Sequence, residues 1–256
     1  MLSLVTRDNG GLSMVEKSWM VLEAFAPGGG PARLTELSSR AGLPRSTVYR
    51  LLCRLADIGT VERSPDGFYL GRRLFELGSM VPVARSLREA ALPFMEDLYV
   101  ATHEAVHVGV MDGHDVVYVE KIYGHDEFSM PSRVGGRLPL TCTAIGKAML
   151  AFAEPDFVQE VLSQPLPRLT KHSIVDPRRL EETLGEIQVS GIAYEYEEVQ
   201  LAGSSLAAPV LAKGRVVAAL SVAVPTSRFQ PVRLAPAVKT AALGLSRLLS
   251  RRPDEI

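Results

Sequence analysis

The chain has 256 residues, of which 46% are hydrophobic, and a formal net charge of −1. This length and composition suit one large domain or two ordinary domains with buried cores. No uncharged apolar run reaches about 18 residues, which excludes a transmembrane helix and a membrane partner. The N-terminus lacks the basic start and long apolar stretch of a secretory signal. The two cysteines, Cys53 and Cys142, lie far apart, which favours reduced thiols and a cytoplasmic location.

The N-terminal segment begins with residues 1–13, whose Asn and Gly content predicts a mobile tail. A helix is expected over residues 14–25, and the Pro- and Gly-rich residues 27–31 predict a loop. Thr35 is placed to cap a short helix, and Gly42 supplies the left-handed backbone that ends it. Pro44 then suits the first turn of a second helix.

The second helix has two distinct faces. Four apolar residues recur at helical spacing and predict a buried stripe: Val48, Leu51, Leu52 and Leu55. The opposite face carries Ser46, Tyr49, Arg50, Cys53 and Arg54. Two helices joined by a short Gly turn, the second with a basic outer face, are typical of a helix-turn-helix.

Residues 59–63 and 68–70 read as short strands around the turn sequence Ser-Pro-Asp-Gly, which predicts a hairpin. A helix-turn-helix followed by a hairpin is a winged helix. Between Arg33 and Arg54 there are five arginines and one acid, Glu36, so attraction to phosphate is local, as in a sequence-specific binder of double-stranded DNA. The alternative is a small helical subdomain whose arginines form a solvated face.

The DNA-binding residues are expected on this face and the wing. Ser46, Tyr49 and Arg50 are predicted to reach base edges in the major groove. Arg45, Arg54 and the wing residue Arg63 are predicted to contact phosphate, with Arg63 able to reach the minor groove. The full predicted set is Arg45, Ser46, Thr47, Tyr49, Arg50, Arg54 and Arg63.

The rest of the chain predicts an α+β domain. A linking helix is expected over residues 72–86, broken near Pro82, and a further helix over 87–102, interrupted early by Pro93. Strands are expected over 105–111, 116–123, 194–199, 205–211 and 215–224, and helices over 146–153, 156–162, 177–189 and 232–249. We therefore predict a winged helix-turn-helix domain over 1–71, a linking helix over 72–86, and an effector-binding and oligomerisation domain over 87–256 with a mainly antiparallel sheet.

Four separated segments carry a resemblance over nearly the whole chain. They are the winged helix ending in GFYLG (67–71), GRLPL (136–140) followed by AIGKA (144–148), GIAYEYEE (191–198), and SLAAPV (205–210) followed by VAALSV (217–222). In this order and spacing they resemble the IclR-type bacterial transcription regulators.

The resemblance implies an N-terminal winged helix, a linking helix and a C-terminal ligand-sensing domain similar to the GAF fold. It also implies a homodimer or homotetramer, no cofactor, and a small organic acid, aromatic acids included, as effector. The chain departs from the family pattern at Glu195, where Asp is usual, at Ser205, where Cys is common, and at Leu211–Ala212, which replace an aromatic-plus-Asp/Asn pair.

By carry-over from the family, the effector site should draw on Leu138, Ala144, Ile145, Glu195, Gly203, Ser205 and Ser221. Hydroxyls and the amides of a helix N-terminus suit a carboxylate, and Leu138 and Ile145 suit an apolar wall. The alternative is that these residues simply pack a core. An ionised Glu195 would repel an anionic effector, so we expect it to bind an effector hydroxyl, or to point away and pair with a Lys or Arg.

A different class of function is the alternative: the chain is then a metabolic enzyme, or a small-molecule sensor with a helical interaction domain. Cys142 with a histidine offers nucleophile and base types, and Glu195 and Glu197 would share one strand face, with Glu198 opposite. His103 and His107 have a spacing compatible with metal ligation, but they straddle a predicted helix-to-strand change. The chain has no nucleophile elbow, phosphate loop or metal motif of known type. We therefore expect no catalytic site and no metal.

Overall fold

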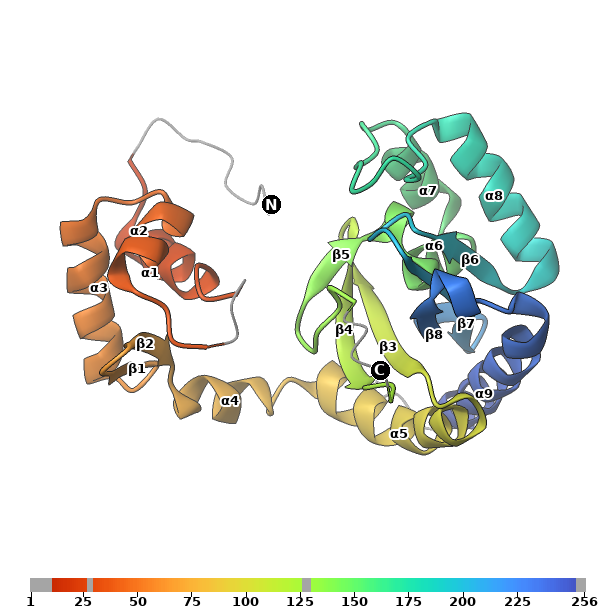
Figure 1. Cartoon of the computed structure of the whole chain (residues 1–256), viewed down its shortest axis with the longest axis horizontal. Helices are drawn as coiled ribbons and strands as arrows, with labels where there is room; N and C mark the ends of the chain where they lie inside the picture. Colours follow the sequence, from red (N-terminus) through yellow and green to blue (C-terminus); the bar gives the residue numbers. More distant parts are fainter. Residues whose placement is uncertain (1–10, 27–29, 126–129, 252–256) are drawn as a thin grey trace. The chain divides into compact units, whose positions relative to one another are not determined.

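The computed structural model describes residues 11–26, 30–125 and 130–251. Residues 1–10 of the tail predicted over 1–13, and residues 27–29 of the predicted loop, lie outside the described residues. The chain divides into two compact units, residues 1–81 and 82–256 (Figure 1). Each unit is built around its own hydrophobic core.

The first unit is a winged helix, as predicted. Its elements are α1 (Met14–Glu23), α2 (Leu34–Ala41), α3 (Arg45–Asp57), β1 (Val61–Ser64), β2 (Gly67–Leu70) and α4 (Arg72–Gly78). Strands β1 and β2 pair in antiparallel register, Val61 opposite Leu70, and Ala32 adds a single bridge to Phe68. The apolar stripe of α3 is buried against α1 and α2, so hydrophobic burial orients α3 and turns its polar face outward.

The capping residue predicted at the C-terminus of α2 is confirmed, but the one predicted at its N-terminus is wrong. Gly42 has φ +64° and its N–H donates to Ser38 and Ser39 carbonyls, which is the left-handed cap expected. Thr35 is not the N-cap: Arg33 is, and its backbone N–H donates to the Glu36 carboxylate at 2.9 Å. The helix starts earlier because that carboxylate satisfies the amide before the first turn.

The break that the sequence predicts near Pro82 is confirmed, but residues 82–86 belong to the following helix and not to the linking helix. Helix α4 ends at Gly78, and α5 (Pro82–Thr102) begins at Pro82. Proline has no N–H to donate, so it is tolerated in a first turn and opens a helix there. Pro93 lies inside α5 without ending it.

The second unit is a six-stranded antiparallel sheet with helices on both faces. In the order β5-β4-β3-β8-β7-β6, its strands are β3 (Ala105–Asp112), β4 (Asp115–Ile122), β5 (Arg137–Pro139), β6 (Ala193–Tyr196), β7 (Gly203–Ala212) and β8 (Arg215–Pro225). Its helices, besides α5, are α6 (Ala144–Leu150), α7 (Pro155–Leu162), α8 (Pro177–Ser190) and α9 (Pro231–Arg251), with 3₁₀ turns η1 (Leu140–Cys142) and η2 (Thr226–Arg228).

Alternation along the strands divides the core into two layers. One face, including Val108, Leu206 and Leu220, packs against α5 and α9. The other face, including Ala207 and Ala219, packs against α6, with α7 and α8 beyond (Figure 1). Because successive side chains on a strand point to opposite faces, the residues facing α6 form a separate set from the larger core.

Two local features shape the α6 face. The register of β3 with β4 shifts between Val108 and Gly109, so that His107 lies opposite Lys121 while Gly109 lies opposite Tyr118. This bulge brings Tyr118 and Lys121, three residues apart, to the same face. Helix α6 lies close to η1: a Cβ on Gly146 would stand 2.1 Å from the Leu140 carbonyl oxygen.

The predicted strand over 194–199 is too long. Strand β6 ends at Tyr196, and Glu197 has φ +55°, a left-handed conformation that cannot continue a strand. The expectation that Glu195 and Glu197 share one strand face, with Glu198 opposite, is therefore wrong.

Candidate functional site

The exposed face of α3 carries most of the residues predicted to contact DNA. Arg45, Ser46, Tyr49, Arg50 and Arg54 are exposed, and Thr47 is half-buried. The same helix buries its opposite side completely at Val48 and Leu52. The arrangement presents four cationic or hydroxyl-bearing side chains and one aromatic ring on a single rigid helix.

The wing residue Arg63 is directed to α3. Its guanidinium lies 2.7 Å from Cys53 Sγ, 5.9 Å from the Tyr49 ring centre and 5.7 Å from the Phe68 ring centre. Stacking on two rings holds the cation in place beside the exposed face of α3. Arg54 pairs with Asp57 at 3.7 Å, with both side chains mostly exposed, and such pairs hold a side chain only weakly.

A small cavity lies in the second unit, between α6 and the sheet. It is lined by His107, Tyr118, Met130, Ser132, Leu138, Thr143, Ala144, Ile145, Val199, Ser205, Ser221 and Ala223. Its volume is about 20 Å³, room for little more than one water molecule. An organic acid can therefore enter only when lining side chains move.

Five of the seven residues predicted for the effector site line this cavity: Leu138, Ala144, Ile145, Ser205 and Ser221. Glu195 and Gly203 are not among the lining residues. Ser205 on β7 and Ser221 on β8 share the face that packs on α6, because Ser205 lies opposite Ala223 and Ser221 opposite Ala207. Thr143 begins α6, and its hydroxyl accepts the Gly146 N–H at 3.0 Å.

Glu195 lies directly behind Ser205 and is fully buried. Its Oε2 accepts the Ser205 hydroxyl at 2.9 Å, and its Oε1 accepts the amides of Glu198 at 2.5 Å and Val199 at 3.3 Å. Burial raises the pKa of Glu195 to about 7, although these hydrogen bonds act in the opposite direction. The expected Lys or Arg partner is wrong: among the described residues, the partners of this carboxyl are a hydroxyl and two amides.

Three polar residues that were not predicted for the effector site form a hydrogen-bonded chain behind Ser221, and a fourth, Tyr118, packs beside it. Lys121 Nζ donates to the Ser132 carbonyl at 2.7 Å and lies 3.4 Å from Ser132 Oγ. Ser132 Oγ lies 2.9 Å from His107 Nε2, and His107 Nδ1 lies 3.5 Å from Ser221 Oγ. Tyr118 packs edge-on against His107, with ring centres 5.5 Å apart.

The electrostatics of this chain keep His107 neutral. Burial, with the nearby Lys121 charge, lowers the pKa of His107 to about 3. Burial also raises the pKa of Tyr118, with a further contribution from Glu195. The only signal in the sequence was one histidine between Val106 and Val108, which reads equally well as a satisfied residue in a strand.

A buried ion pair ties α6 to the segment after β6. Lys147 and Glu198 are both almost completely inaccessible to solvent, and their charged groups are hydrogen-bonded. Since the Glu198 amide also donates to Glu195, the wall of the cavity, α6 and the Glu195 carboxyl are connected. Removing one member of such a pair leaves a buried charge without its partner, which is strongly destabilising.

The groups considered for catalysis or metal binding do not converge. The Cys142 thiol is buried and donates to the Pro167 carbonyl at 3.4 Å, and burial raises its pKa. His103 packs on Tyr99 and His125, whereas His107 belongs to the cavity. Within residues 11–26, 30–125 and 130–251, no group of three or more His, Cys, Asp or Glu side chains is placed to hold a metal ion. Over the same ranges no helix has the length and apolarity to span a membrane.

The first unit has a helix with an exposed, arginine-bearing face beside a wing, and the second unit holds a small cavity in which a few polar groups lie among apolar side chains. This combination is typical of a DNA-binding transcription regulator with an effector domain. Residues 14–65 match the IclR helix-turn-helix domain. Residues 81–247 match the C-terminal domain of the bacterial transcriptional regulator IclR. The chain therefore belongs to the IclR family of bacterial transcription regulators.

Individual relatives agree with this assignment. The chain is 36% identical over 200 residues to the HTH-type transcriptional regulator KdgR of Dickeya chrysanthemi, spanning 77% of this chain and 66% of that protein. It is 31% identical to the HTH-type transcriptional regulator XynR of Escherichia coli, over 93% of this chain and 97% of that protein. The crystal structure of an IclR homolog from Microbacterium hydrocarbonoxydans complexed with 4-hydroxybenzoate superposes with a TM-score of 0.82 at 32% identity, covering 94% of this chain and 100% of that chain.

Proposed function

We propose that this regulator binds an operator through α3 and the wing, and that a small organic acid bound between α6 and the sheet changes that binding. The observation that carries the proposal is the cavity itself, which gathers serine hydroxyls from two strands, one histidine and an apolar wall. Small-molecule sites combine mostly apolar walls with a few convergent polar groups. The first unit supplies an arginine-bearing face that suits phosphate and base edges.

On the DNA side, we propose that Ser46, Tyr49 and Arg50 read base edges and that Arg45 and Arg54 contact phosphate. Thr47, being half-buried, supports the start of α3. Arg63 stacks on the Tyr49 ring and so helps to hold Tyr49 in place. Because the Arg63 side chain is also exposed, we propose that it contacts a phosphate from the wing. We also propose a cytoplasmic location, because bacterial operator DNA lies in the cytoplasm.

On the effector side, a small carboxylate is supported by the chemistry of the lining and by the relative complexed with 4-hydroxybenzoate. Leu138 and Ile145 supply apolar surface, and Ser205 and Ser221 supply hydroxyls. Glu195 does not line the cavity, and we propose that it acts on the effector through the hydrogen bond that Ser205 donates to it. No catalytic role is proposed: Cys142 holds its thiol on a carbonyl oxygen, and burial keeps it protonated by raising its pKa.

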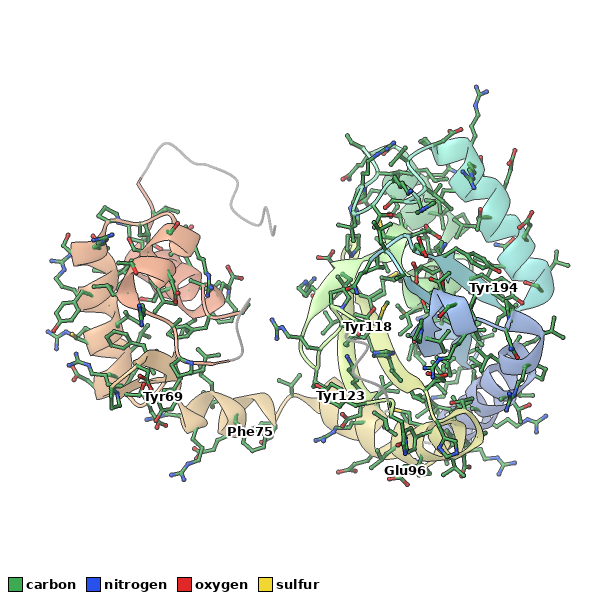
Figure 2. All side chains as sticks on the ribbon, in the orientation of Figure 1. Tyr69, Phe75, Glu96, Tyr118, Tyr123 and Tyr194 are labelled. Atoms are coloured by element: carbon green, nitrogen blue, oxygen red, sulfur yellow. The ribbon has the colours of Figure 1, made fainter. Side chains whose placement is uncertain are left out.

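We propose the domain roles predicted from the sequence. Residues 1–71 bind DNA, residues 72–86 connect the two domains, and residues 87–256 bind the effector and form the oligomer contacts. Helix α4 and the residues between it and α5 expose Phe75, Leu77, Met80 and Val81, and Figure 2 labels Phe75 on α4. Exposed apolar side chains gathered on one short segment are typical of protein contacts. They support a homodimer or homotetramer.

The test joins effector and operator in one assay. An operator is selected from random duplexes by the full chain, and its affinity is measured with and without 4-hydroxybenzoate and related acids. We expect an acid to change the operator affinity of the natural chain but not that of Ser205→Leu, whose ligand-free affinity stays near normal. Ser163→Leu, an exposed site on the same unit, is the control. An unchanged effector response in Ser205→Leu contradicts the site.

A further inference from the structure

The hydrogen bonds behind Ser205 and Ser221 lead to groups of opposite charge, the Glu195 carboxyl and the Lys121 ammonium. We propose that they give the cavity a fixed polarity, in which Ser205 accepts and Ser221 donates, so that the effector carries a hydroxyl donor at one end and a carboxylate at the other. This inference rests on the proposed function and adds the chemical class of the effector. It also assigns a positioning role to Lys121, Ser132 and His107.

At the Ser205 end, the hydroxyl hydrogen is committed. Ser205 donates to Glu195 Oε2, while Glu195 Oε1 is already occupied by two amides. Above pH 7, where Glu195 is mostly ionised because its pKa is about 7, the carboxylate has no hydrogen to return, so Ser205 offers only lone pairs to the cavity. A ligand hydroxyl can donate to them, but a carboxylate oxygen cannot.

At the Ser221 end, the chain of donors begins with Lys121, which has hydrogens and no lone pairs. Ser132 Oγ lies within reach of Lys121 and of His107 Nε2. Having accepted from Lys121, this hydroxyl still has its own hydrogen to donate, and we assign that hydrogen to His107 Nε2, 2.9 Å away. The nearby cation also favours a lone pair on that nitrogen. His107 therefore carries its hydrogen on Nδ1.

The Nδ1 hydrogen of His107 points to Ser221 Oγ, 3.5 Å away. Ser221 then accepts from the ring and keeps its own hydroxyl hydrogen for the cavity. His107 stays neutral because burial, with Lys121, lowers its pKa to about 3, so the single-hydrogen form persists across the physiological range. Ser221 is thus a donor suited to a carboxylate oxygen.

The charges behind the two serines favour the same orientation of the effector as the hydrogen bonds do. The Lys121 ammonium stands behind Ser221 through Ser132 and His107, and the Glu195 carboxyl stands behind Ser205. Ser205 and Ser221 are diagonal neighbours on paired strands, which corresponds to a separation of roughly 7–8 Å. An effector carboxylate is therefore attracted to one end and repelled from the other, and a short skeleton can span both.

The first experiment compares matched acids at pH 8, where Glu195 is largely ionised. The full chain is titrated with 4-hydroxybenzoate, 4-methoxybenzoate and 4-methylbenzoate, and with 4-hydroxybutyrate and pentanoate as aliphatic counterparts. We expect a hydroxy acid to bind roughly tenfold more tightly than its methyl and methoxy analogues, since these leave a buried acceptor unpaired. Equal affinities would overturn this inference while leaving the proposed function intact. Absence of binding by every acid would overturn both.

The second experiment inverts the polarity at Ser205. In Glu195→Gln, the side-chain oxygen keeps the two amides and the NH₂ group donates to Ser205, which frees the serine hydroxyl hydrogen for the cavity. A methoxy oxygen can accept this hydrogen, whereas it cannot donate to the natural Ser205, so we expect the preference for 4-hydroxybenzoate over 4-methoxybenzoate to fall to within about threefold. Glu197→Gln, two residues along the chain, is the matched control and keeps the preference. A preference unchanged in Glu195→Gln would overturn the assignment at Ser205.

The third experiment reads the His107 tautomer without any ligand. Ring nitrogen chemical shifts of the ¹⁵N-labelled chain, assigned by comparison with His107→Gln, distinguish hydrogen on Nδ1 from hydrogen on Nε2. We expect the Nδ1–H form, unchanged between pH 8 and pH 5, and a shift toward Nε2–H in Lys121→Met. An Nε2–H form in the natural chain would overturn the assignment at Ser221, because Nδ1 would then take the serine hydrogen.

Discussion

Replacing Glu195 with Gln should make the second unit more stable at high pH relative to the natural chain. Burial raises the pKa of Glu195 from 4.5 to about 7. A carboxyl with a raised pKa in the folded state binds its proton more tightly there than when unfolded, so its contribution to stability is complete below pH 4.5 and is lost as pH rises through about 7. Glutamine cannot ionise and keeps its contribution.

The expected magnitude follows from the size of the shift. Each unit of pKa corresponds to about 1.4 kcal/mol, so the free energy of unfolding of Glu195→Gln, minus that of the natural chain, should rise by about 3 kcal/mol between pH 4.5 and pH 8. His107 acts in the opposite direction, because its pKa is lowered to about 3 and its stabilising contribution is lost as pH falls below 6.5. Both chains contain His107, so its effect cancels in the difference.

The assay must report on the second unit. The single tryptophan, Trp19, belongs to the first unit, so tryptophan fluorescence would follow the wrong transition. Denaturant unfolding followed by hydrogen exchange of the β7 and β8 amides reports the sheet directly. Glu197→Gln serves as the control for a change of charge nearby. A difference between Glu195→Gln and the natural chain that stays constant from pH 4.5 to pH 8 would refute the reasoning.

Three further predictions concern DNA binding and packing. Arg50→Ala should lose about 1–3 kcal/mol of discrimination between operator and random DNA, measured by competition; equal weakening on both would show a phosphate contact only. Arg45→Ala and Arg54→Ala should each reduce the slope of log affinity against log salt by about 0.9, and unchanged slopes would contradict their role. Gly146→Ala should cost about 1–3 kcal/mol in thermal or denaturant unfolding, because its Cβ meets the η1 backbone at 2.1 Å. Gly185→Ala in α8, where a Cβ meets no atom within 4 Å, should be neutral or stabilising by up to about 1 kcal/mol, and a similar loss in both variants would argue against the clash.

The winged helix could be predicted because its signals are local. Gly42 marks the end of α2, the apolar stripe of α3 defines which side is buried, and the turn after Ser64 predicts the hairpin. Each depends on a few neighbouring residues and on general preferences of the backbone. The helix break near Pro82 was also predicted, but residues 82–86 were assigned to the linking helix instead of α5. Pro82 can end one helix or open the next, and only the packing of α5 decides between them.

The cavity between α6 and the sheet could be predicted only in part. The resemblance to the family predicted Ser205, Ser221 and the start of α6, because these residues lie in the sequence segments that carry the resemblance. Lys121, Ser132 and His107 carry no such signal, since they are far apart in the chain and each suits an ordinary strand or loop. They converge only because a bulge shifts the β3–β4 register and β3 pairs with β8. The sequence by itself therefore determined the class of protein. The tertiary structure decided which charged groups stand behind the serines of the cavity, because those groups are brought together by strand pairing.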